Sequence, residues 1–183
     1  MRIEGYAVVG DDDRIADAAG QMPNALKNDA EWAFFQDGLD EADIVALGRR
    51  SHDVTPNPRR RRRLVLTRSV ARAKRQGDVV FWNPAGASLE AAVEAFGCPV
   101  QHIAVAGGRD VFDFFLRPPH RYTAFHLSQI EGVKLPGGTG VFGAVETGGL
   151  TAADVLASFG YGPASTRTLE TGVSVATWVP DCV

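Results

Sequence analysis

Three apolar runs of this chain each end in residues that can hold a phosphate group. They are followed by Gly48-Arg49-Arg50-Ser51, by Thr67-Arg68-Ser69 and by Gly107-Gly108-Arg109. Guanidinium groups bind phosphate oxygens as forked donors, hydroxyls add hydrogen bonds, and glycines let the backbone come close to the anion. In an open α/β sheet such groups gather at the carboxyl ends of the strands, where ligands bind. The segments predict a dinucleotide cleft; solvated arginines, and a turn before a helix that needs small residues, remain the alternatives.

The elements that would position these turns alternate along the chain. Expected strands cover residues 3–9, 44–47, 65–67, 79–82, 103–106 and 122–130, and expected helices cover 28–39, 88–96 and 111–116. Residues 11–23 and 132–140 are expected as loops, and the basic connection after residue 67 as helical or irregular. Residues 155–159 and 166–179 favour a closing antiparallel hairpin. We therefore expect an α/β fold, a mixed, mainly parallel twisted sheet with flanking helices and a C-terminal antiparallel hairpin.

Composition limits the class of protein. With 183 residues and 45% hydrophobic content, the chain is expected to form one domain over residues 1–183. Its apolar runs fall short of the ~20 residues of a membrane-spanning helix, and the first five residues lack the layout of a signal peptide. We expect a cytoplasmic protein without a membrane partner, as a monomer or homodimer. Cys98 and Cys182 lack metal-ligand spacing, so no metal site or disulfide framework is expected and both are interpreted as free thiols.

Further motifs accompany the phosphate-type turns in order. Asp13-Arg14-Ile15, Met22-Pro23 and Leu26 precede the first turn, Val105-Ala106 precedes the last, and Ser128 follows. Together with the turns, they resemble the dihydrofolate reductase superfamily, which also includes the reductase domain of riboflavin-pathway enzymes. The resemblance covers residues 3–142 and, more loosely, the terminal hairpin.

The resemblance implies NADPH as the cofactor. The residues expected to bind it are Ala7, Ile15, Gly48, Arg49, Arg50, Ser51, Thr67, Arg68, Ser69, Ala106, Gly107, Gly108, Arg109 and Val111. Arg49, Arg50 and Arg68 would meet the phosphate that distinguishes NADPH from NADH. The bond between Gly107 and Gly108 is cis in the family.

The resemblance also implies two catalytic residues, Asp29 as the acid and Ser128 as its hydrogen-bond partner. Reducing a C=N bond needs a hydride at carbon and a proton at nitrogen. Burial in an apolar cleft would raise the pKa of Asp29 toward the working pH. The alternative is that Asp29 only favours the dipole of a helix that Asn28 and Glu31 cap. The residues expected at the substrate are Val8, Val9, Leu26, Phe34 and Arg61, the last where an arginine holds the glutamate carboxylate of folate.

Three positions depart from the family pattern and leave the substrate open. Asn24 stands where a tryptophan is usual, Ala33 replaces an aromatic residue, and Arg109 replaces a third glycine. Dihydrofolate is the leading substrate that the resemblance implies, so the expected activity is that of a dihydrofolate reductase, which forms tetrahydrofolate. A ribosylated aminopyrimidine of riboflavin synthesis is the second. A protein that binds NADPH without efficient catalysis is the third interpretation.

An unbroken basic run, Arg59 to Arg63, could neutralise several nucleic-acid phosphates. The net charge of −3 and the lack of nearby aromatic residues argue against that use, so no nucleic-acid partner is expected. The open alternatives are a solubilising or cofactor-rim role, and capture of a substrate anion by Arg61.

Overall fold

The computed structural model describes residues 1–147 and 149–181, and most of its strands form one large sheet. The strands are β1 (Arg2–Val9), β2 (Arg14–Ala16), β3 (Ile44–Gly48), β4 (Arg63–Leu66), β5 (Ala73–Gln76), β6 (Val79–Trp82), β7 (His102–Val105), β8 (Ala124–Ile130), β9 (Thr139–Gly140), β10 (Tyr161–Glu170) and β11 (Val173–Pro180). The helices are α1 (Asp29–Asp40), α2 (Arg49–Val54), α3 (Leu89–Glu94), α4 (Arg109–Leu116), α5 (Gly143–Thr147) and α6 (Ala152–Ser158), and Asn24–Leu26 forms a 3₁₀ turn.

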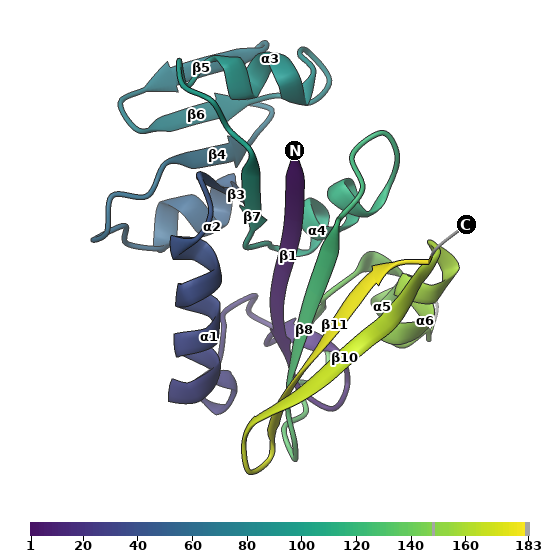
Figure 1. Ribbon diagram of the computed structural model, residues 1–183. Helices are drawn as coiled ribbons and strands as arrows, with labels where there is room; N and C mark the ends of the chain where they lie inside the picture. Colours follow the sequence, from purple (N-terminus) through teal and green to yellow (C-terminus); the bar gives the residue numbers. More distant parts are fainter. Residues whose placement is uncertain (148, 182–183) are drawn as a thin grey trace.

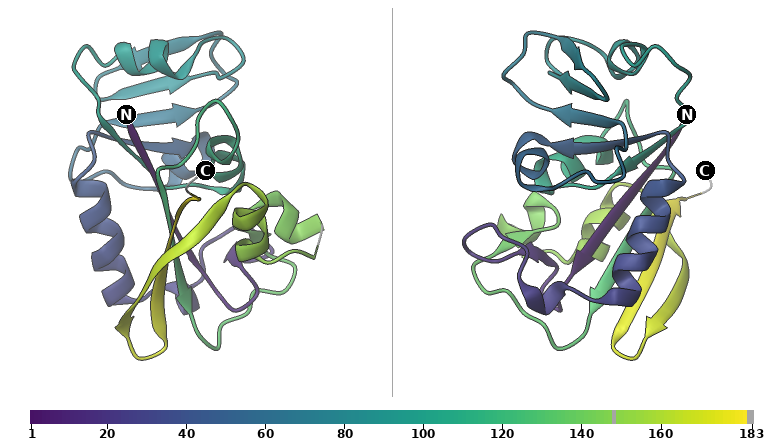
Figure 2. Two further views of the ribbon diagram at one scale, coloured as in Figure 1. Left: turned by 45° about the vertical axis from the view of Figure 1, so that its right-hand side comes forward. Right: turned by 90° about the vertical axis from the view of Figure 1, so that its left-hand side faces the viewer.

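The sheet has nine strands in the order β10-β11-β8-β1-β7-β3-β4-β6-β5, and β2 pairs separately with β9. Neighbours from β8 to β6 are parallel, whereas β11, β10 and β5 join antiparallel. In Figure 2, β4 and β6 run across the view while β8 runs down it, so the sheet is strongly twisted. The predicted mixed, mainly parallel sheet with a C-terminal hairpin is confirmed.

Helices cover the two faces of the sheet unequally (Figure 1). On one face, Leu39 of α1 packs in a cluster with Tyr6, Val45, Val65 and other strand residues. On the other face, α3, α4, α5 and α6 contribute to a larger cluster that is built on alternate residues of the same strands. The even-numbered residues of β1 from Glu4 to Val8 face α1 as a result. None of the helices in the described ranges has the length and apolar character to cross a bilayer.

Two sequence expectations about secondary structure are wrong. The basic connection after β4 contains β5, which pairs antiparallel with β6. Residues 155–159 lie mostly in α6, which Thr151 opens with a capping box to Asp154, and the hairpin consists of β10 and β11 instead. The turn of that hairpin contains Gly172, whose φ of +76° favours glycine. The expected loops also contain the short strands β2 and β9, and α5 was not predicted.

Candidate active site

The first and third phosphate-type turns lie side by side. β3 pairs with β7 and with β4, all parallel, so the carboxyl ends of these strands share one edge of the sheet. At that edge, Gly48 N donates a hydrogen bond of 2.9 Å to Gly107 O. The Gly107-Gly108 bond is cis. The predicted turns after β3, β4 and β7 are therefore brought together.

Close packing under these turns requires glycine at Gly107. Its φ is +94°, and a Cβ atom there would lie 2.8 Å from the Phe112 ring. A Cβ atom on Gly48 would lie 3.4 Å from Val111, which therefore packs beneath the first turn. Ala7 and Val111 belong to the large core cluster, and Ile15 packs against it. Ala106 continues the pairing of β7, because its N–H donates to Ala46 O at 2.9 Å.

Hydroxyl and guanidinium groups line the same edge. The Thr67 and Ser69 hydroxyls lie 3.0 Å apart, and Ser69 N donates to Thr67 Oγ1. Arg49 is paired with Asp53 at 2.8 Å, and Arg50 donates to the carbonyl of Ala19 in the loop before α1. Within residues 1–147 and 149–181, Arg68 forms no ion pair. Its charge is therefore available to an anion.

Arg109 and Ser51 belong to the third and the first of these turns, respectively. Arg109 opens α4 directly after the glycine pair, and its guanidinium donates to Glu146 at 2.7 Å and to Asp110 at 3.0 Å. Ser51 lies in the first turn of α2. Arg109 is thereby held between α4 and α5, at the edge of the turn.

The buried carboxyl group of the site is that of Glu31. Its side chain is only 4% exposed, and its hydrogen-bond partner Ser128 is 1% exposed. Burial raises the pKa of Glu31 to about 7, while the hydrogen bond from Ser128 acts in the opposite direction. Ser128 lies opposite Val8 in the β1–β8 register, one residue from the end of β1. The acid therefore faces the carboxyl-terminal half of the parallel strands.

Asp29 is not at this position, so the expectation of Asp29 in an apolar cleft is wrong. Asn28 caps α1 by accepting a hydrogen bond from Glu31 N at 3.0 Å, which makes Asp29 the first helical residue. Its side chain is exposed there. The Glu31 side chain was expected to complete the cap, but it turns inward to Ser128 instead.

The expected apolar substrate residues divide into three groups. Leu26 is fully buried in a cluster with Ile130 and Val173, and Val8 packs against it. Val9 points to the opposite face and belongs to the large core cluster, so it does not join the acid. Phe34 packs against the sheet, with its ring 6.0 Å from Tyr6.

Arg61 is already held by carboxylate and amide groups of α1. Its Nε donates to Asp40 at 2.7 Å and its Nη2 donates to the Gln36 side chain at 2.8 Å. Arg59 also pairs with Asp40, and Arg63 donates to the carbonyls of Thr55 and Pro56. Arg59, Arg61 and Arg63, alternate residues of the basic run, therefore bind other groups of the protein itself.

Glu31→Gln should stabilise the protein at neutral and higher pH. Because the pKa of Glu31 is raised in the folded state, the folded protein keeps a proton that the unfolded chain releases between about pH 4.5 and pH 7. Stability from this group is therefore lost as the pH rises through that window, by up to about 3 kcal/mol. Urea unfolding across this window should give a smaller loss for Glu31→Gln than for the wild type. Asp29→Asn should follow the wild type, and parallel curves for all three proteins would contradict the assignment.

Comparison with known proteins gives structural likeness only. No family model matches the chain, and neither does any curated protein sequence. A protein assigned to riboflavin biosynthesis from Shewanella sp. PV-4 superposes with a TM-score of 0.67 at 17% identity, covering 100% of both chains. A diaminohydroxyphosphoribosylaminopyrimidine deaminase/5-amino-6-(5-phosphoribosylamino)uracil reductase from Thermotoga maritima gives 0.67 at 15% identity over 98% of this chain and 56% of its own. Dihydrofolate reductase from Enterococcus faecalis, complexed with NADP(H) and RAB-propyl, gives 0.63 at 14% identity over 97% and 95%. The chain therefore has the dihydrofolate-reductase-like fold.

Proposed function

We propose that this chain is an NADPH-dependent reductase that reduces a C=N bond of a pterin- or aminopyrimidine-type substrate, with Glu31 as the proton donor. The observation that carries the proposal is the Glu31 carboxyl group, buried against Ser128 with a pKa of about 7. Such a group is present in both protonation states near neutral pH, which suits general acid catalysis. The fold shared with reductases supports the reaction class, and dihydrofolate is the first substrate to test.

The residues at the strand ends fit a dinucleotide with a 2′-phosphate. Arg68 lacks an acidic partner in the described ranges, and the neighbouring Thr67 and Ser69 hydroxyls are already gathered in one turn. Arg50 is bound only to a backbone carbonyl among the described residues, so a phosphate can compete for it. Gly48 and Gly107, whose backbones are hydrogen-bonded to each other, would lie beside the pyrophosphate. These are the residues that we expect to hold NADPH.

When bound, the nicotinamide supplies a hydride, and the protein supplies orientation and a proton. Glu31 gives its proton to the substrate nitrogen as the adjacent carbon is reduced. Ser128 holds the carboxyl group in place, because its hydroxyl is fixed on β8 opposite Val8. Burial of the Glu31 side chain keeps its pKa high. After the product leaves, the Glu31 carboxylate takes up one proton from bulk solvent, so each turnover consumes one solvent proton.

The proposal is tested by the rate of NADPH oxidation with dihydrofolate, measured beside a fluorescence titration of NADPH binding. Binding with oxidation that depends on dihydrofolate is the expected result. Binding without oxidation by dihydrofolate, dihydropterin or a ribosylated aminopyrimidine would leave an NADPH-binding protein. Absence of binding would reject the cofactor site itself.

Asp40 and Gln36 already engage Arg61, which supports a site that does not bind the glutamate tail of dihydrofolate through this residue. We expect kcat/KM for dihydrofolate and for tail-less dihydropterin to differ by less than about threefold, whereas a free arginine on the tail carboxylate would contribute about tenfold or more. The engagement of Arg61 within the fold supports the aminopyrimidine of riboflavin synthesis as the second candidate substrate. Steady-state kinetics with both pterins check the expectation, and a tenfold preference for dihydrofolate would show that Arg61 leaves Asp40 in the complex.

A further inference from the structure

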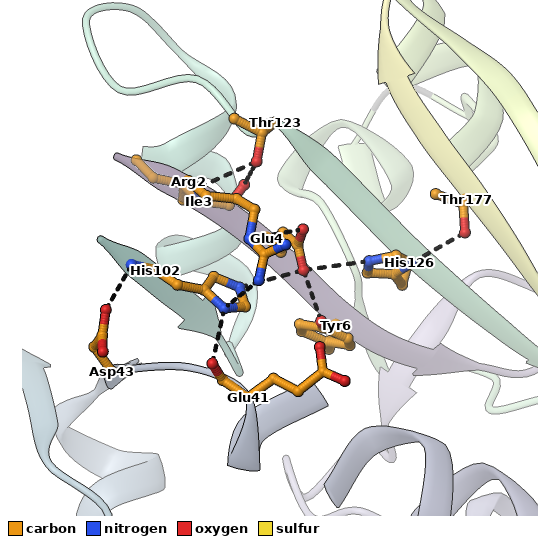
Figure 3. A network of polar contacts seen from close by, with 10 residues as sticks. All are labelled: Arg2, Ile3, Glu4, Tyr6, Glu41, Asp43, His102, Thr123, His126 and Thr177. Atoms are coloured by element: carbon orange, nitrogen blue, oxygen red, sulfur yellow. Dashed lines mark hydrogen bonds and ion pairs between the residues drawn. The ribbon is translucent and has the colours of Figure 1, made fainter. Parts of the chain in front are cut away.

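A cluster of ionisable side chains lies near the carboxyl-terminal end of α1, toward the amino-terminal end of β1 (Figure 3). Its centre is the carboxylate of Glu4. Glu4 Oε2 accepts a hydrogen bond from the Tyr6 hydroxyl at 2.8 Å, and it lies 3.2 Å from His102 Nε2 and 3.8 Å from His126 Nε2. Arg2 Nε lies 3.4 Å from the other oxygen. One side chain of β1 therefore links this strand to β7 and to β8.

Glu4 is surrounded by groups that lower its pKa. Arg2 Nη2 lies 2.9 Å from His102 Nδ1, which also lies 3.3 Å from the carbonyl oxygen of Glu41, and His102 Nε2 faces Glu4. The pKa of Glu4 is lowered to about 2, chiefly through His126 and then through Tyr6, His102 and Arg2, although burial opposes the shift. Glu4 is therefore anionic throughout the neutral pH range.

Tyr6 and His126 form the surface on which α1 rests. Their rings stack at 4.7 Å with an interplanar angle of 27°. Phe34 of α1 meets the edge of His126 at 5.7 Å, and Phe35 meets the edge of Tyr6 at 6.5 Å. The far nitrogen of His126 lies 3.0 Å from the Thr177 hydroxyl of β11. Glu4 therefore contacts both rings, and Thr177 of β11 contacts that of His126 as well.

The same two elements carry the proposed acid and its partner. Glu31 precedes Phe34 by three residues, which is one helical turn. Ser128 follows His126 by two residues, which places both on the α1 face of β8. The contact of Phe34 with His126 and the contact of Glu31 with Ser128 are therefore neighbours across one interface between α1 and β8.

We infer that Glu4 is a positioning residue for Glu31: by holding Tyr6 and His126 against α1, it fixes the acid opposite Ser128 and away from water. The effect on turnover rests on the proposed function, whereas the placement of Glu31 is a property of the fold. Other charged groups around this interface are Arg2, His102, Glu41, which acts on Tyr6, and Arg167 of β10, whose guanidinium lies 5.2 Å from the Phe34 ring centre. Without Glu4, the support under α1 loosens and water reaches Glu31.

The test is a titration of the Glu31 carboxyl carbon by ¹³C NMR in the wild type and in Glu4→Gln, with Glu31→Gln to assign the signal. The wild-type midpoint should lie near 7. In Glu4→Gln it should fall by about one pH unit, which lowers the protonated fraction, and turnover with it, about tenfold on the alkaline side. Hydrogen exchange of the α1 amides should be faster in the same variant. Glu90→Gln, which removes an exposed carboxylate at the start of α3, should change neither quantity.

An unchanged midpoint in folded Glu4→Gln would overturn the inference. A lower midpoint with unchanged α1 exchange would also overturn it, because the shift would then be an effect of charge alone. If Glu4→Gln does not fold, Tyr6→Phe keeps the ring, loses the hydrogen bond to Glu4 and should give a smaller shift in the same direction. A wild type without turnover, but with the shift in its variant, would reject the reductase proposal and leave this inference standing.

Discussion

Replacing Glu31 with glutamine should lower kcat for NADPH-dependent reduction about 100- to 1,000-fold at neutral pH, because the proton donor is lost. Glutamine has nearly the same shape and can still accept the hydrogen bond from Ser128, so the substrate pocket should remain. The affinity for NADPH should be unchanged, since Glu31 is on α1, facing Ser128, and not at the turns after β3, β4 and β7. Steady-state kinetics with an NADPH titration separate the two effects.

Asp29→Asn is the matched control for this change. Asp29 is two residues away on the same helix, and its side chain is exposed, so its loss should leave kcat within about twofold. The wild-type rate should also fall as the pH rises through about 7, because the pKa of Glu31 lies there and the protonated form donates. Full activity of Glu31→Gln would assign the proton to water, and loss of activity in Asp29→Asn would return the role to that residue.

Replacing Arg68 with alanine should weaken NADPH binding about 10- to 100-fold and leave NADH binding unchanged. The charge of Arg68 is free of acidic partners in the described ranges, and it stands between two hydroxyls that a phosphate can share. A phosphate dianion interacts most strongly with such a forked donor, and NADH lacks that phosphate. Fluorescence titrations of both cofactors measure the ratio.

Arg117→Ala is the control for the loss of a positive charge. Arg117 is exposed at the carboxyl end of α4, away from the turn that precedes this helix. It should bind both cofactors as the wild type does. Equal loss of NADPH and NADH affinity in Arg68→Ala would mean that Arg68 holds a phosphate common to both, and equal use of the two cofactors by the wild type would contradict a 2′-phosphate site.

The parallel part of the fold follows from short-range patterns in the sequence. The apolar run of residues 44–47 predicts a strand, and Asn28 predicts the start of a helix, from the local sequence alone. The structure has both features. β5 could not be predicted in the same way, because Ala73–Gln76 is polar and mostly exposed at an edge of the sheet. Its strand form depends on pairing with β6. α6 had a local signal, the capping box of Thr151 and Asp154. The prediction of a hairpin rested on the apolar residues of 155–159 and did not use this signal.

The buried carboxyl group of Glu31 could have been predicted from its position around the helix axis. With Asn28 as the cap, Glu31 shares a face with Phe35, Gly38 and Leu39, at the spacing of a buried stripe, and the structure buries it there. Asp29 lies nearly opposite that stripe. Asp29 was expected to be the acid because of its position after Met22-Pro23. That expectation assumes a fixed length for the connecting loop. The engagement of Arg61 by Asp40 depends on side chains 21 residues apart, which no local pattern indicates.

The most direct test of a reductase is the transfer of deuterium from NADPH labelled at the reacting carbon of its nicotinamide. The purified protein is incubated with the labelled cofactor and dihydrofolate, dihydropterin or a ribosylated aminopyrimidine. The masses of the products are then measured by mass spectrometry. We expect one deuterium in the reduced product, from one face of the nicotinamide only, with the transfer much slower in Glu31→Gln. Products without deuterium, from a protein that binds NADPH, would contradict hydride transfer at this site.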